Sequence, residues 1–159
     1  MDLNLENLLP QVLTIAQEAG ELILSIVKAS ADIEVEYKQD NTPVTQVDQA
    51  ANDFIVTALQ ALTPTIPIIA EEALNADLAQ IDADSAYWLV DPLDGTKGFI
   101  AGSDQYTVNI ALVYQRYPIL GVIVAPALHQ AYYAASGIPA CADMISGMQV
   151  LTTVSAAPL

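Results

Sequence analysis

The chain has 159 residues, of which 53% are hydrophobic and only 14% charged. These values exclude wholesale disorder and predict one domain with a sizeable core. Four Lys and Arg residues stand against 19 Asp and Glu residues, which gives a formal net charge of −15. So acidic a chain has no basic surface for nucleic-acid phosphates and is repelled by anionic membranes. A metal ion or backbone amides would have to hold any anionic ligand.

Neither the cysteine content nor the first residues indicate secretion. Cys141 is the single cysteine, so the chain can form no internal disulfide. The N-terminus reads Met-Asp-Leu-Asn, without the basic region of a signal peptide. No apolar run reaches the ~18–20 residues that a membrane span needs. We therefore expect a cytoplasmic protein without a membrane span.

Hydrophobic periodicity places the helices before most of the strands. Apolar residues recur at spacings of three and four in two segments and alternate or run together in the others. The first helix is expected to follow Asn7 as N-cap, with Pro10 in its first turn. The acidic segment 73–84 could be a short helix or a surface loop. In chain order, the sequence predicts a helix over 8–27, a strand over 33–37, a helix over 45–62, and strands over 66–70, 87–90, 106–114, 119–124, 130–135 and 150–154.

This order of elements indicates the fold class. Helices followed by a cluster of strands, with a short hairpin link near Arg116, favour a layered α+β domain with a largely antiparallel sheet. A doubly wound α/β fold would need helices between its strands. No internal repeat divides the chain, so residues 1–159 are expected to form one domain.

Two of the predicted apolar strands end in carboxylates. The run Ile68-Ile69-Ala70 precedes Glu71 and Glu72, and the run Trp88-Leu89-Val90 precedes Asp91-Pro92-Leu93-Asp94. An unpaired carboxylate at the edge of a core is costly, and a divalent cation removes that cost. Magnesium prefers such oxygen ligands. The pattern therefore predicts a magnesium site where these strands end.

The residues after Asp91 are suited to a metal site beside a phosphate site. Pro92 fixes its own φ and biases Asp91 towards an extended backbone, so both Asp carboxylates and the carbonyl between them can converge. Gly95 permits a sharp entry into a short helix that begins at Thr96. The free N–H groups at the start of that helix would favour a phosphate oxygen.

The stretch Trp88-Leu89-Val90-Asp91-Pro92-Leu93-Asp94-Gly95-Thr96-Lys97-Gly98-Phe99 resembles the signature of the inositol monophosphatase-like superfamily of magnesium-dependent phosphatases. The segments Pro43–Asp48 and Ile68–Glu72 agree with it in order and spacing. Within the superfamily, residues 95–97, 108–112 and 118–122 are most similar to the 3′(2′),5′-bisphosphate nucleotidases of the CysQ type. Gly98 departs from these, because they usually carry Glu there.

The resemblance implies the N-terminal part of the inositol monophosphatase-like sugar phosphatase fold, as a metal-binding half. No segment matches the family's later Trp-Asp-Thr-Ala-Ala-like motif, whose Asp completes the metal site. The chain therefore resembles roughly the first three-fifths of a phosphatase. Because the family's layers bury apolar faces against each other, we expect self-association through an uncovered apolar face.

The resemblance also implies roles for individual residues. Glu71, Asp91, Asp94 and the backbone carbonyl of Leu93 match the family's magnesium ligands, in a complete site with two or more ions. Asp48 and Thr96 match a catalytic pair in which the carboxylate orients the hydroxyl that helps to activate the attacking water. The substrate phosphate would be lined by Glu71, Leu93, Asp94, Gly95 and Thr96.

Simpler structural roles remain open for several of these residues. Asp91 and Asp94 could be turn residues, since Asp is common in turns. Asp48 stands three residues after Thr45, as in a helix capping box, and Thr96 could be an N-cap. Lys97 could steer a substrate phosphate or be an ordinary exposed lysine.

The function implied by the resemblance is a magnesium-dependent phosphomonoesterase for a small phosphorylated substrate. Hydrolysis of adenosine 3′,5′-bisphosphate to AMP and phosphate, a step of sulfur assimilation in relatives, is the first expectation. An inositol monophosphatase-type or sugar-phosphate phosphatase is the alternative among enzymes. An inactive fragment, or a half that needs a complementing partner, is the alternative of another class.

Overall fold

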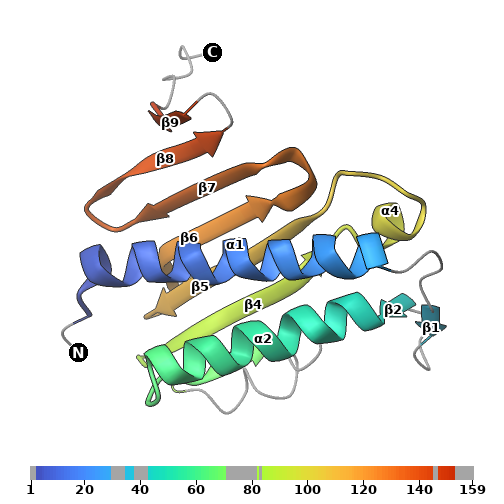
Figure 1. Cartoon of the computed structure of the whole chain (residues 1–159). Coiled ribbons are helices and arrows are strands. Elements are labelled where there is room, and N and C mark those ends of the chain that lie inside the picture. Colours follow the sequence, from blue (N-terminus) through green and yellow to red (C-terminus); the bar gives the residue numbers. More distant parts are fainter. Residues whose placement is uncertain are drawn as a thin grey trace, which may run out of the picture.

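The computed structural model describes residues 3–29, 35–37, 43–70, 82, 84–144 and 147–152. Its elements follow one another in an order that begins with a long helix and ends with a meander of strands (Figure 1). They are α1 (Leu5–Ala29), β1 (Val35–Tyr37), β2 (Pro43–Thr45), α2 (Gln46–Leu62), β3 (Ile68–Ala70), β4 (Ala86–Asp94), α4 (Thr96–Ile100), β5 (Thr107–Tyr114), β6 (Tyr117–Ala125), η3 (Pro126–Leu128), β7 (Gln130–Ala135), β8 (Ile138–Met144) and β9 (Gly147–Val150).

Seven strands form one sheet whose spatial order, β3-β4-β5-β6-β7-β8-β9, is also their order in the sequence. Strands β3 and β4 are parallel, and every later neighbouring pair is antiparallel. Strands β1 and β2 form a separate two-stranded ribbon. The predicted α+β class with a largely antiparallel sheet is confirmed.

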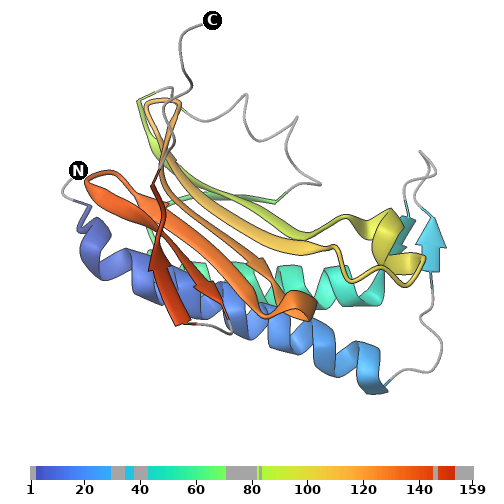
Figure 2. The same ribbon diagram turned by 90° about the horizontal axis from the view of Figure 1, so that it is seen from above.

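Both long helices lie on the same face of the sheet (Figures 1 and 2). Helix α1 packs across β5, β6 and β7, and α2 packs on β3 and β4. Side chains alternate between the faces of a strand, so Trp88, Ile110 and Val122, each at most 1% exposed, lie on the helix side. The indole N–H of Trp88 donates a 2.8 Å hydrogen bond to the hydroxyl of Thr63 at the end of α2. This bond ties α2 to the strand that carries the expected metal ligands.

Helix α1 begins earlier than the sequence predicts. The backbone N–H of Asn7 donates to the side-chain oxygen of Asn4 at 3.1 Å, so Asn4 is the N-cap and the prediction of Asn7 was wrong. The earlier start brings Leu5 and Leu8 against the core. Pro10 consequently lies inside the helix rather than in its first turn.

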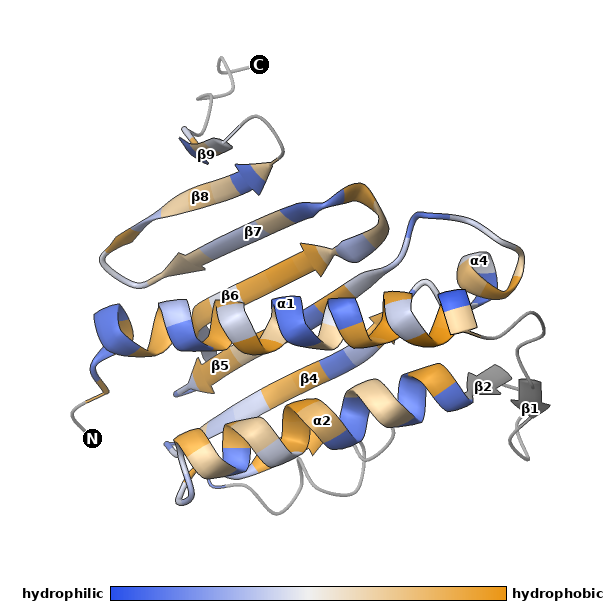
Figure 3. Cartoon of the chain, viewed as in Figure 1, coloured by the Kyte–Doolittle hydropathy of each residue, from blue (hydrophilic) through white to orange (hydrophobic). Residues whose placement is uncertain are grey.

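The sheet's other face, which we call the outer face, is apolar near its centre. The cross-strand row Leu89, Ala111, Gly121 and Ala134 lies on it, as does Ile123, which is 46% exposed. Figure 3 shows how much of β4, β5 and β6 consists of hydrophobic residues. No described helix or strand covers this face, because α1 and α2 pack on the opposite one. No helix among the described residues is long and apolar enough to cross a membrane.

The C-terminal strands differ most from the sequence-based expectation. Strand β8 was not predicted, because residues 138–144 include Pro and several Ala residues and have little β-propensity of their own. Its conformation depends on pairing with β7 and β9. The strand predicted over 150–154 is β9, which lies earlier, at Gly147–Val150. Of the acidic segment 73–84, only residues 82 and 84 are among those described.

Candidate active site

The carboxylates of β4 lie where its pairing with β5 is interrupted. The Cα partner of Asp91 is Asn109 and that of Asp94 is Thr107, with a shift in register between the two pairs. The strand was predicted to end at Asp91, but pairing resumes after the irregularity and continues to Asp94. A register shift re-aims side chains, and here it leaves Leu93 only 1% exposed.

Asp91 and Asp94 differ in their environments. Asp91 is half-buried, and its Oδ1 atom is shielded from solvent, whereas Asp94 is exposed. The buried Leu93 side chain anchors the backbone between them in the core. The arrangement therefore presents one sheltered carboxylate and one open carboxylate on either side of a fixed backbone segment.

Gly95 turns the chain from β4 into α4. Its φ is +87°, and a Cβ atom at this position would lie 2.9 Å from the backbone oxygen of Gln105. Any side chain would therefore combine backbone strain with a collision against backbone. The carbonyl of Gly95 accepts a 2.9 Å hydrogen bond from the N–H of Phe99, which closes the turn of α4.

The Thr96 hydroxyl donates a 2.9 Å hydrogen bond to the backbone carbonyl of Leu93. The resemblance implies Asp48 as the residue that orients this hydroxyl, whereas the bond found here lies within the turn itself. A carbonyl oxygen has two lone pairs, so Leu93 retains acceptor capacity for another partner. Thr96 thus fixes the carbonyl that was expected to bind magnesium.

Asp48 lies in the first turn of α2 and is half-buried. Strand β2 directly precedes α2 and contacts both α2 and α4. This contact brings the start of α2 towards the turn that contains Thr96. The proposed cap partner of Asp48, the Thr45 side chain, lies outside what the structure describes, so the capping role stays a prediction.

An aromatic pair holds α4 against the start of β5. The rings of Phe99 and Tyr106 meet edge to face, with centroids 4.9 Å apart and planes at 82°. Both side chains are nearly buried. Burial raises the pKa of the Tyr106 phenol above its usual value, and the charge of Asp104 raises it further. Both aromatic residues follow the Gly95 turn in the sequence.

Glu71, the third expected carboxylate, lies outside the described residues. The residue before it, Ala70, is the Cα partner of Val90, which directly precedes Asp91, in the parallel pair β3–β4. Among the described residues, no group of three His, Cys, Asp or Glu side chains could hold a metal ion. The described donors, Asp91, Asp94 and the Leu93 carbonyl, are all oxygen atoms, which is the chemistry that magnesium requires. They fit part of a magnesium site.

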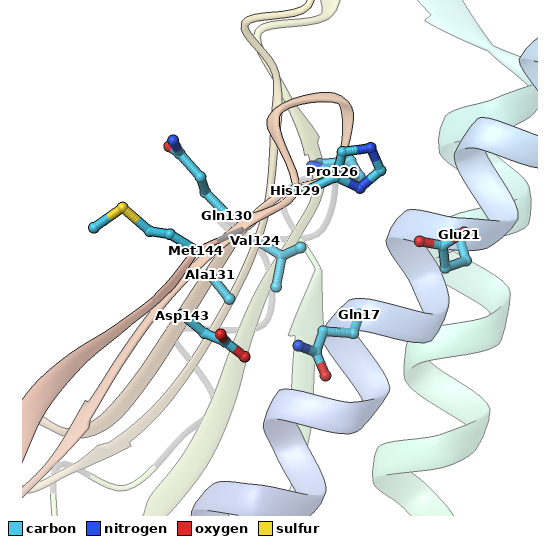
Figure 4. A pocket seen from close by; sticks show the side chains of 9 residues that line it. All are labelled: Gln17, Glu21, Val124, Pro126, His129, Gln130, Ala131, Asp143 and Met144. Carbon is cyan, nitrogen blue, oxygen red and sulfur yellow. The ribbon is translucent and has the colours of Figure 1, made fainter. Parts of the chain in front are cut away.

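A separate hollow of about 250 Å³ lies between α1 and the strands β7 and β8 (Figure 4). Gln17 and Glu21 of α1 face Asp143 of β8 across it. None of the expected site residues contributes to its walls. They are Gln17, Glu21, Val124, Pro126, His129, Gln130, Ala131, Asp143 and Met144.

Known proteins resemble this chain in both sequence and fold. Residues 4–158 match the inositol monophosphatase family. The 3′(2′),5′-bisphosphate nucleotidase CysQ of Salmonella typhimurium is 46% identical over 131 residues, which are 82% of this chain and 52% of that protein. Its counterpart in Aggregatibacter actinomycetemcomitans is 44% identical over 134 residues, 84% of this chain and 49% of that protein.

Among solved structures, CysQ from Bacteroides thetaiotaomicron has 30% sequence identity and a TM-score of 0.72, with 99% of this chain and 62% of that one covered. The chain spans about half the length of the curated relatives it matches, somewhat less than the three-fifths expected. The match over nearly the whole chain and the shared fold lead to one conclusion: the chain belongs to the inositol monophosphatase family.

Proposed function

We propose that this chain provides the acidic half of a magnesium-dependent phosphomonoesterase site. The observation that carries the proposal is the end of β4, where Asp91 and Asp94 flank the buried Leu93 and lead into the Gly95 turn. In a member of this family, that cluster of hard oxygen donors beside a tight turn fits an ion and a phosphate group together.

Magnesium would be held by Asp91, Asp94, the Leu93 carbonyl and Glu71. When bound, such ions lower the pKa of a ligated water and stabilise the charge of the departing oxygen. Glu71 is part of the proposal because its predecessor, Ala70, is paired with Val90.

The chain's own residues would position the substrate and move a proton. Glu71, Leu93, Asp94, Gly95 and Thr96 would line the phosphate. The Thr96 hydroxyl is placed by its bond to Leu93. In the complex with substrate it would accept a hydrogen bond from the attacking water and pass its own proton to the Asp48 carboxylate as the water gives up a proton. Asp48 would orient the hydroxyl in the complex with substrate, since the contact of β2 with α2 and α4 brings the two segments together.

The substrate we propose is adenosine 3′,5′-bisphosphate, hydrolysed to AMP and phosphate as a cytoplasmic step of sulfur assimilation. The support is that relatives 42–46% identical to this chain are named 3′(2′),5′-bisphosphate nucleotidase. Inositol monophosphates are the second choice, because the family carries their name. Other segments of a longer protein, or a complementing partner, would be needed if this half alone does not turn over substrate.

Calorimetry with Mg²⁺ or Mn²⁺ tests the metal site in the chain as it stands. Asp91→Asn should abolish binding, because the sheltered carboxylate loses its charge. Asp53→Asn is the matched control, since Asp53 is an exposed carboxylate on α2 that bonds only to neighbouring side chains of its own helix. Equal binding by the wild type and Asp91→Asn would contradict the ligand assignment.

Phosphate release tests the activity itself. A panel should contain adenosine 3′,5′-bisphosphate, 2′-AMP, inositol 1-phosphate and a sugar phosphate, each with and without magnesium. We expect magnesium-dependent release, fastest from the bisphosphate. Metal binding without release from any substrate would favour the alternative of a half that needs a partner.

A further inference from the structure

Asn109 of β5 lies directly across from Asp91 of β4. The two residues are Cα partners in an antiparallel pair, so their side chains project from the same face of the sheet. Directly opposite residues in such pairs have Cβ atoms about 4.5–5.5 Å apart. A carboxamide and a carboxylate at this separation can reach each other through side-chain rotation alone.

The position of Asn109 is unusual for a polar side chain. The neighbouring row of the outer face is entirely apolar, with Leu89, Ala111 and Gly121 paired in succession. In its own row, the next strand contributes Ile123. Asn109 is half-buried, and its carboxamide makes no hydrogen bond to any residue that the structure describes. Both N–H groups of this amide are therefore available to a ligand or to a side chain that binds one.

We propose that Asn109 is a positioning residue of the acidic site, whose amide N–H donates to the Asp91 carboxylate when that carboxylate holds a divalent ion. The inference rests on the proposed function, because it needs Asp91 to be a metal ligand. Carboxylates that ligate a metal are themselves held by hydrogen bonds, which fix the direction of the lone pair offered to the ion. Asn109 is on the correct strand and face, and it is the cross-strand neighbour.

The role differs from that of Thr107, the corresponding partner of Asp94. Asp94 is exposed, so water can supply its hydrogen bonds. Asp91 has an oxygen shielded from solvent, so a hydrogen-bond donor from the protein would stabilise its carboxylate more than it would stabilise that of Asp94. Asn109 is therefore the residue whose hydrogen bond would hold the Asp91 carboxylate in place.

The test compares Mn²⁺ affinity by calorimetry among variants of this chain. Asn109→Leu keeps the branched shape of the side chain and removes the donor, and it should weaken binding about 10- to 100-fold, the usual loss for such supporting residues. Asn109→Gln keeps the carboxamide and should recover much of the affinity. Ala111→Val is the control: it changes the same face of the same strand, opposite Leu89, and should leave affinity unchanged.

Thermal unfolding followed by the fluorescence of Trp88, the single tryptophan, separates positioning from folding. A melting temperature that falls in Asn109→Leu with no change in Mn²⁺ affinity would show a merely structural role and overturn the inference. If Asn109→Leu binds Mn²⁺ as tightly as the wild type while Asp91→Asn does not bind it, this inference is overturned and the proposed function stays intact. Absence of Mn²⁺ binding in the wild type would overturn both.

Discussion

The hydroxyl of Thr96 and the carbonyl of Leu93 are joined by a 2.9 Å hydrogen bond across the turn that follows β4. Leu93 is anchored in the core by its side chain, so the bond connects the start of α4 to a fixed point. One hydroxyl thereby sets the geometry of both the expected metal-binding carbonyl and the expected catalytic group.

Removing this bond should cost stability as well as activity. Thr96→Val keeps the shape of the side chain and removes the donor, so we expect a loss of about 0.5–1.5 kcal/mol in the free energy of unfolding. Thr96→Ser retains the hydroxyl and should lose less. Urea denaturation monitored by Trp88 fluorescence measures both variants. A stability for Thr96→Val equal to that of the wild type would mean that the bond contributes nothing to the fold.

Gly95 should tolerate substitution much less well than Gly102, although both have a positive φ. The values are +87° for Gly95 and +80° for Gly102, but a Cβ atom would lie 2.9 Å from backbone at the first and within 4 Å of nothing at the second. Left-handed backbone costs about 1–2 kcal/mol for a residue with a side chain. Overpacking adds about 1–3 kcal/mol. We therefore expect Gly95→Ala to lose more stability than Gly102→Ala in urea denaturation.

Equal losses in the two glycine variants would show that the chain around Gln105 moves aside at little cost. That result would also weaken the view that the turn is held rigidly against β5. The double variant should lose the sum of the two single losses if the sites are independent.

The sequence predicted the turn at Gly95 and the short helix that begins at Thr96, because the signal for them is local. Asp91, Pro92, Asp94 and Gly95 constrain one short loop, and the chemistry of each residue type indicates its role. The continuation of β4 beyond Asp91 could not be predicted, because it depends on pairing with Thr107, which is far along the chain. The position of Asn109 opposite Asp91 could not be predicted for the same reason. Only the strand register places its side chain beside Asp91.

The same difference between local and long-range signals explains which parts of the fold could be predicted. Periodicity within one segment predicted α1, α2 and the central strands. Strand β8 was missed because its composition is neutral and only its neighbours hold it in the sheet. The cap at Asn4 was missed because the apolar stripe alone does not fix where a helix begins.

The catalytic pair can be tested by a double-mutant cycle. If Asp48 orients Thr96 in the complex with substrate, Asp48→Asn and Thr96→Val should each lower kcat in an active form of the protein, and Asp48→Asn should leave metal affinity nearly unchanged. The double variant should be no slower than the slower single variant, because the two residues act as one unit. Strictly additive losses of activation free energy would indicate that Asp48 only caps α2.

Tyr106 should make stability depend on pH in the alkaline range. Burial, with a contribution from Asp104, raises the pKa of this phenol above its ordinary value of 10.0. The folded state therefore holds the proton more tightly than the unfolded state. The resulting stabilisation is fully present below the unfolded pKa and is lost as the pH rises through the folded pKa. Urea denaturation between pH 8 and 11 should show a flatter profile for Tyr106→Phe, and parallel profiles would contradict this.

The outer face should make this chain self-associate. Its apolar row of Leu89, Ala111, Gly121 and Ala134 continues to the exposed Ile123, and no described element covers it. Contiguous apolar surface of this kind marks interaction sites or aggregation. The net charge of −15 opposes association, but salt screens exposed charges beyond about 8–10 Å and leaves apolar contact intact. We therefore expect a second copy of the chain to pair with this face at physiological salt.

Sedimentation velocity at low and physiological salt measures this association. Ile123→Lys should shift the chain towards monomer, because a charge would be placed in the contact. Leu128→Lys is the matched control, since Leu128 is 41% exposed but belongs to η3, between β6 and β7. The two variants carry the same net charge, so a difference between them reports the position of the contact rather than electrostatic repulsion. A monomeric wild type at every salt concentration, or equal effects of the two substitutions, would show that the outer face does not drive association.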